Sequence, residues 1–181
     1  MNIKTSVYKI VNYSELWKNK INNIEFYFAD NKDYIMDYFL GLSELSINYS
    51  SIIDYSLIKY GLCYSRVIHN STLFDFWNPL MVKKGPLVNT FAEFIKYKFF
   101  DNHVCIDLIN IFINDFSKND YVLLISRLLF PTYYFDLLKD VNNNSININS
   151  IVNRVEDYVE FVKSIINEIK KRYFDIPSLD F

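Results

Sequence analysis

The sequence predicts an α+β domain that is predominantly α-helical, a helical bundle with a small β-hairpin or sheet. Along most of the 181-residue chain, apolar residues recur every three or four positions, the period of one helix face. The chain has three glycines and four prolines, which are few for the tight turns of a many-stranded sheet. Hydrophobic residues make up 51% of it, enough to bury a substantial core in a single domain, residues 1–181.

The N-terminal part of the chain predicts a lead-in followed by two helices. Residues 1–13 alternate loosely between polar and apolar side chains and are interpreted as a lead-in or a strand. Residues 14–51 are predicted to form a helical pair. Ser14 is the expected N-cap of the first helix, and Asn31 or Asp33 that of the second, because short polar side chains bond the free amides of a first turn.

The pattern changes over residues 53–86, which are predicted to form a hairpin or a sheet of two to four strands. One or two short strands are expected around Gly61. Asn70 and Ser71 are typical of a turn. The stretch from Phe74 to Pro86 indicates a loop or the second arm of a hairpin.

Residues 87–181 are predicted to form a helical bundle. Ser117 and Asp120 match a capping box at the start of a helix that Pro131 then interrupts. Residues 142–149 are interpreted as a solvated connector because they are mostly asparagine. Three apolar stripes predict the other helices: Val88, Phe91, Ile95 and Phe99; Leu108, Ile109, Phe112, Ile113 and Phe116; Val152, Val155, Val159, Val162, Ile166, Ile169 and Tyr173.

The last of these stripes belongs to the best-defined helix of the chain. Acidic residues occur early in it and Lys170, Lys171 and Arg172 occur late, which matches the helix dipole. Its heptad-like repeat is compatible with a coiled-coil partner. We expect instead that the stripe packs on the core of its own domain, because the repeat is short.

Charge and composition exclude several classes of function. A formal net charge of −2 and a pI near 5.7 argue against a nucleic-acid-binding protein. Charged or amide residues interrupt every apolar run before roughly 18 residues, so no transmembrane segment is expected. Cys63 and Cys105 are too few for a disulfide framework, and no signal peptide is recognised, so a cytoplasmic location is expected.

Three kinds of reactive site were considered and judged improbable. Zinc could be drawn from Cys63, His69, His103 and Cys105, but their spacing matches no common zinc pattern, and buried thiols are the better interpretation. The same residues could supply a Cys–His nucleophile only if the fold brought them together. Carboxylate pairs at Asp115 and Asp120, or at Glu156 and Glu160, are interpreted as solvated helix faces.

From Tyr38 onward, the order of elements resembles the C-terminal lobe of the aminoglycoside phosphotransferase/choline kinase-like family. The likeness is strongest to the spore-coat-associated kinase-like proteins of that family. It is carried by four segments, of which the last, an aliphatic helix followed by Arg127 and Leu-Leu-Phe-Pro, is the most specific: Tyr38–Tyr49, Leu62–Asn70, Asn78–Phe100 and Tyr121–Val141. The resemblance implies a kinase-like C-terminal-lobe architecture without the N-terminal lobe.

The residues that perform phosphoryl transfer in this family are replaced. A catalytic His-x-Asp loop corresponds to the stretch from Cys63 to Arg66, so Tyr64 stands near the histidine and Arg66 near the aspartate. The metal-holding aspartate falls in Val-Lys-Lys-Gly, at Lys84 and Gly85. Magnesium needs oxygen ligands. The resemblance therefore implies no catalytic residue, no bound metal and no cofactor.

The resemblance favours a catalytically inactive, pseudokinase-like protein that binds a protein partner or a separately encoded lobe. Glu93, Lys96, Arg127 and the Phe130–Pro131 corner are interpreted as retained scaffold. One alternative is a divergent phosphotransferase that uses another acid, such as Asp75, or is completed by another subunit. A second alternative is a helical structural or interaction module unrelated to kinases.

Overall fold

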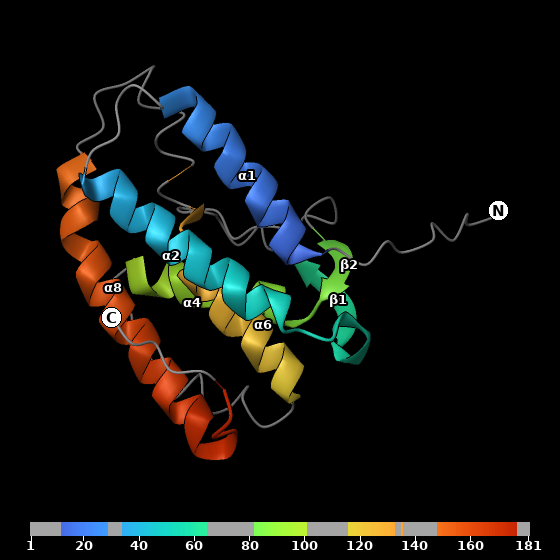
Figure 1. Cartoon of the computed structure of the whole chain (residues 1–181). Helices are drawn as coiled ribbons and strands as arrows, with labels where there is room; N and C mark the ends of the chain where they lie inside the picture. Colours follow the sequence, from blue (N-terminus) through green and yellow to red (C-terminus); the bar gives the residue numbers. More distant parts are fainter. Residues whose placement is uncertain are drawn as a thin grey trace.

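The structure is a computed structural model that describes residues 12–28, 34–64, 82–100, 116–132, 135 and 148–176. Most of these residues are helical, and the described part of the chain also contains one two-stranded antiparallel sheet (Figure 1). This confirms an α-rich α+β protein. The elements in chain order are α1 (Tyr13–Phe28), α2 (Tyr34–Ser51), the short 3-10 helix η2 (Tyr55–Leu57), β1 (Tyr60–Tyr64), β2 (Val82–Pro86), α4 (Val88–Phe100), α6 (Lys118–Leu129) and α8 (Ile148–Arg172).

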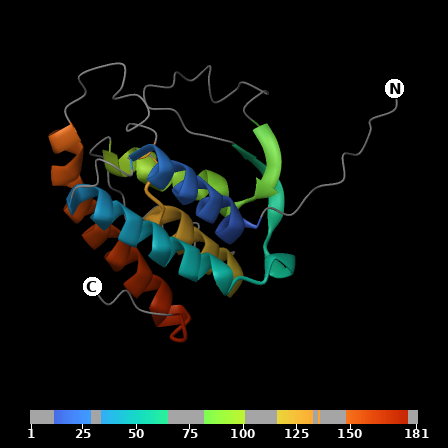
Figure 2. The ribbon, with the colours of Figure 1, turned by 45° about the horizontal axis from the view of Figure 1, so that its top comes forward.

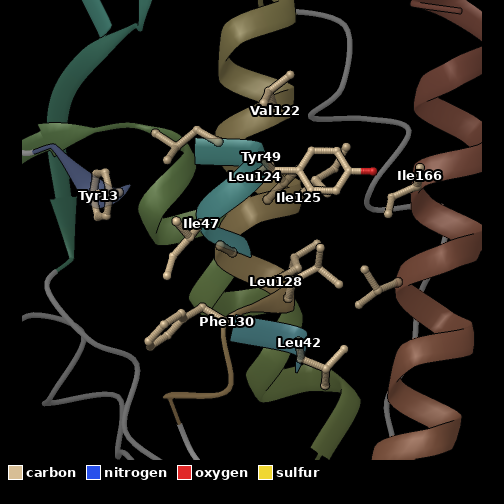
Figure 3. Packing of buried hydrophobic residues seen from close by; sticks show 14 of the residues in the cluster. Tyr13, Leu42, Ile47, Tyr49, Val122, Leu124, Ile125, Leu128, Phe130 and Ile166 are labelled. Atoms are coloured by element: carbon tan, nitrogen blue, oxygen red, sulfur yellow. The ribbon is translucent and has the colours of Figure 1, made fainter. Parts of the chain in front are cut away.

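Helix α6 is the centre of the bundle. It packs against α2, α4 and α8, while α1 packs on α2. Figures 1 and 2 show α6 enclosed by these helices, with the sheet at one end of the bundle next to the start of α1. Nine of the twelve residues of α6 are buried, and Figure 3 shows side chains from α2, α6 and α8 that meet in this core. A helix that is apolar on nearly every side is the kind that occupies the interior of a bundle.

The two ends of α6 are stabilised in different ways. At its start, Ser117 and Asp120 form the predicted capping box, and each side chain accepts a hydrogen bond from the backbone N–H of the other. The helix ends at Leu129, before Pro131, as predicted. Proline has no N–H to continue the helix, so the backbone bonds at this end are those of the Phe130 amide to the Ser126 carbonyl at 3.1 Å and of the Thr132 amide to the Phe130 carbonyl at 2.8 Å.

The neighbouring helices add side-chain donors at this end of α6. Ser46 of α2 donates its hydroxyl to the Ser126 carbonyl at 2.7 Å, and Tyr158 of α8 donates to the Leu128 carbonyl at 2.7 Å. Lys96 of α4 donates its ammonium group to the Phe130 carbonyl at 2.9 Å. Three helices that pack on α6 therefore each donate a side-chain hydrogen bond to a carbonyl at or just after its C-terminal turn. This links the local end of one helix to the tertiary arrangement of three others.

The α2–α6 contact is close because small polar side chains lie within it. Ser46 and Ser126 exchange hydrogen bonds, since Ser126 donates to the Ser46 carbonyl at 2.6 Å in return. Both side chains are completely buried. Buried hydroxyl groups need hydrogen-bond partners, and this reciprocal pair satisfies both at the helix contact.

Two predicted boundaries were wrong. Helix α1 begins at Tyr13, and Asn12, not Ser14, caps it by accepting the Glu15 amide at 3.3 Å. The helix starts earlier because Tyr13 is buried and its amide donates to the Tyr55 hydroxyl at 3.1 Å, a contact between distant parts of the chain. Helix α8 begins at Ile148, inside the predicted connector.

The predicted stripe of α8 faces the interior of its own domain, as expected. Val159, Val162, Ile166 and Ile169 are buried, and α8 contacts α6. Of the stripes predicted over residues 87–116, the first forms α4. Residues 108–115 lie outside the described part of the chain, as do Asn31, Asp33, Asn70 and Ser71. None of the helices that the structure describes combines the length and apolar character needed to span a bilayer.

Candidate functional site

Two of the stretches that were expected to correspond to kinase loops pair in one two-stranded sheet, here called the β1–β2 hairpin. Strands β1 and β2 pair antiparallel, with Leu62 opposite Lys84 and Tyr64 opposite Val82. Gly85 lies opposite Gly61. Of the four substituted positions, Tyr64, Lys84 and Gly85 therefore belong to the same small sheet. Arg66 lies outside the described residues, so its position relative to the sheet stays a prediction.

The two strands expose cations and an apolar side chain. Lys83 and Lys84 are exposed, whereas Gly85 and Pro86 are buried. Leu62 is 77% exposed although it lies in the middle of a strand. The outward surface of the hairpin is thus basic and apolar, with no carboxylate on either strand. Such a surface does not provide the oxygen ligands that magnesium requires.

Of the four residues considered for zinc and judged improbable as a site, Cys63 is the one that the structure describes. Its thiol is free and buried. Burial raises the pKa of this thiol, and nearby Lys83 and Arg127 offset the increase only in part. A thiol with a raised pKa is protonated at neutral pH and is a poor nucleophile and metal ligand. His69, His103 and Cys105 lie outside the described residues.

The carboxylates also have identifiable surroundings. Asp120 accepts the Ser117 and Lys59 amides at 2.9 and 3.0 Å, and so serves the helix cap and the approach to β1. Glu160 pairs with Lys163 at 2.6 Å on the exposed face of α8. Within the described ranges, no three His, Cys, Asp or Glu side chains are close enough to one another to hold a metal ion. Asp75 and Asp115 lie outside those ranges.

A second polar cluster lies between α1, α4 and α6. Arg127 donates to the Glu93 carboxylate at 2.7 Å, and its guanidinium lies 5.4 Å from the centre of the Tyr13 ring. Asn89 donates its amide to the Tyr13 hydroxyl at 2.6 Å. The structure thus brings together two residues that were interpreted as scaffold. Together with the Lys96 bond to the Phe130 carbonyl, they connect α4 to α6.

Sequence reasoning missed two members of these sites. Tyr13 was placed in the lead-in, and its contacts with Asn89 and Tyr55 join positions too far apart for any periodicity to reveal. Leu62 was assigned to a strand, but its exposure could not be predicted. An alternating strand pattern tells which residues share a face, and only the packing decides which face stays open.

No family model, no curated protein and no solved structure matches this chain. We therefore infer function from the side chains of the β1–β2 hairpin and from the scaffold that holds it.

Proposed function

We propose that this protein acts by binding a protein partner, as a catalytically inactive counterpart of the kinase-like C-terminal lobe. The hairpin follows α2 and precedes α4 in the chain, which is the order of elements that the resemblance implies. Glu93 and Arg127, both part of the expected scaffold, are bonded to each other. The scaffold and the hairpin are therefore consistent with a lobe that has kept its framework and changed its loop residues.

The chemistry of the hairpin favours binding over phosphoryl transfer. In active kinases, carboxylates hold the magnesium ions that neutralise the developing charge on the phosphates. Here Lys84 projects from the corresponding stretch and Gly85 has no side chain. Lysines beside a metal position repel the cation, so a magnesium complex of ATP would lack its usual ligands.

The observation that carries the proposal is the exposure of Leu62. Burying a leucine side chain contributes about 1.5–3 kcal/mol relative to leaving it in water, so its 77% exposure leaves most of that gain unused. Single exposed leucines are common. Leu62 is unusual because it lies within a strand and directly opposite a lysine. A partner that covers it gains both apolar and electrostatic contacts.

The test is a thermal-shift titration of the purified protein with ATP, with and without Mg²⁺, followed by an ATP turnover assay. A ligand that binds only the folded state at 100 times its Kd stabilises it by about 2.7 kcal/mol, which raises Tm by several degrees. We expect neither a Mg²⁺-dependent shift nor turnover. Turnover that is lost when a carboxylate such as Asp75 is replaced by asparagine would overturn the proposal in favour of a divergent phosphotransferase.

A further inference from the structure

The hydrogen-bonding pattern of the hairpin determines which backbone groups point outward. The Leu87 amide donates to the Lys59 carbonyl at 3.0 Å, which continues the β1–β2 register by one pair. Hydrogen-bonded and non-hydrogen-bonded pairs alternate in an antiparallel ladder. The pairs of Gly61 and of Cys63 are therefore hydrogen-bonded, and the N–H and C=O groups of Leu62 point away from β2.

Pro86 agrees with this assignment. It lies opposite Tyr60, in a pair that the alternation makes non-hydrogen-bonded. Proline has no N–H, so within a sheet it fits where that group would point away from the partner strand. The outward groups of β1 thus belong to Tyr60, Leu62 and Tyr64. They form the outer edge of a sheet that has two strands in the described part of the chain.

The two edges of the sheet differ in their protection against strand pairing. Lysines and prolines on an edge strand are the features that prevent another chain from pairing with it. Strand β2 has Lys83, Lys84 and Pro86 within five residues. Strand β1 reads Tyr-Gly-Leu-Cys-Tyr and has neither a charge nor a proline. The edge of β2 is thus protected by its composition, whereas the edge of β1 is suited to pairing.

The charge around the sheet indicates the chemistry of the segment that would pair. The described residues between 52 and 90 contain three lysines, at positions 59, 83 and 84, and one acidic residue, Asp54, a formal charge of +2, although the whole chain has a charge of −2. Exposed Leu62 and exposed Lys83 lie on opposite faces of the sheet, because Lys83 is opposite Cys63, the residue after Leu62. An added strand with apolar side chains on the Leu62 face and acidic side chains on the Lys83 face would match both. An added basic strand would be repelled.

We infer that the outer edge of β1 accepts an extended, acidic segment of a partner protein as a third strand. In strand addition, backbone hydrogen bonds supply affinity and alternate side chains supply specificity. Here the Leu62 backbone supplies the hydrogen bonds, and the side chains of Leu62 on one face and Lys83 on the other supply the specificity. This inference rests on the proposed binding function and names the class of partner and the element that receives it.

The probe is a synthetic peptide of about eight residues with valine and glutamate in alternation, long enough to span a strand. Binding is measured by fluorescence anisotropy, and amide exchange is measured by NMR. In the free protein we expect the Leu62 amide to exchange quickly and the Gly61 and Cys63 amides slowly. Addition of the peptide is expected to protect Leu62, and added salt is expected to weaken binding. The control peptide has lysine in place of glutamate and is expected not to bind.

Leu62→Pro tests the backbone contact, because it removes an outward N–H and leaves the hydrogen-bonded pairs intact, as Pro86 does on β2. We expect it to weaken peptide binding about tenfold or more. Leu62→Ala keeps the N–H and should retain part of the affinity. Leu57→Ala removes a similarly exposed leucine outside the sheet and should change nothing. Slow exchange of Cys63 in the Leu62→Pro variant verifies that the hairpin is still formed.

Three results would overturn the inference. One is a Leu62 amide already protected in the free protein, which would mean that the chain itself covers the edge. The second is equal binding of the acidic and basic peptides, or no binding of either. The third is unchanged affinity in Leu62→Pro. Any of these would leave the proposed function standing, whereas ATP turnover would contradict that function whatever the peptides do.

Discussion

At the scale of single residues, the tyrosine hydroxyl groups show how differently buried polar atoms are treated. Tyr158 donates to the Leu128 carbonyl at 2.7 Å, in the last turn of α6. The Tyr121 hydroxyl is buried and makes no hydrogen bond of good geometry within the described residues, although the effect of burial on its pKa is partly offset by the nearby Arg172. The first hydroxyl satisfies a carbonyl at the helix end, whereas the second gains only this weaker contact in place of water.

The two tyrosines provide a matched pair of variants. We expect Tyr158→Phe to lower the free energy of unfolding by about 1–2 kcal/mol, because the Leu128 carbonyl loses its donor in a buried place. Tyr121→Phe is expected to be close to neutral at neutral pH, since it removes a hydroxyl whose desolvation is offset only by the nearby Arg172. Urea unfolding at neutral pH measures both. Equal losses in the two variants would contradict the assignment of the hydrogen bond.

At the scale of elements, Asp120 connects the start of α6 to the sheet. Its carboxylate accepts the Ser117 amide and hydroxyl at 2.9 and 2.7 Å, and also the Lys59 amide at 3.0 Å. The first two bonds belong to the capping box. The third bond fixes the residue that precedes β1, so one side chain positions both the central helix and the candidate binding strand.

We expect Asp120→Ala to destabilise the protein by about 2–3 kcal/mol, from the loss of a cap and of a buried acceptor. Asp175→Ala is the control, because Asp175 makes a charge-assisted bond to Lys118 at the surface, where ion pairs contribute little. Thermal unfolding followed by circular dichroism compares them. If Asp175→Ala destabilised the protein as much as Asp120→Ala, the Lys59 contact would have no special role.

At the scale of the whole molecule, tyrosines with raised pKa values occur in several elements of the fold. Burial raises the pKa of Tyr55 and Tyr60 near the sheet, that of Tyr121 in α6 to about 12, and that of Tyr158 in α8 well above its ordinary value of 10.0. In each case the folded protein holds its proton more tightly than the unfolded chain does. Tyrosine ionisation is therefore coupled to unfolding of the bundle.

The sign of this coupling predicts alkaline unfolding. A raised pKa contributes stability that is fully present below the unfolded-state value, near pH 10, and is lost as pH rises through the folded-state values. We expect the urea concentration at the unfolding midpoint to decrease as the pH is raised above 10. Tyrosinate absorbance is expected to increase over the same pH range in which helix is lost. Tyr121→Phe should make the fall less steep. Tyrosinate that forms fully while helicity is unchanged would contradict the coupling.

The sequence alone determined the features that depend on neighbours in the chain. Helix geometry explains the spacing of apolar residues in α2, α4 and α8. The availability of backbone donors explains the capping box at Ser117 and the end of α6 before Pro131. The class of the fold follows from the same local patterns. That Lys84 and Gly85 offer no oxygen side chain to a metal ion could likewise be read from residue types.

Only the tertiary structure decided which distant groups meet. Helix α1 starts at Tyr13 because Tyr55 and Asn89 hold that residue, and neither contact leaves a trace in local periodicity. The side-chain hydrogen bonds from Ser46, Lys96 and Tyr158 to the end of α6 depend on three helices that pack around it. The same reason explains Leu62: alternation assigned it to one face of a strand, but the arrangement of the helices left that face open.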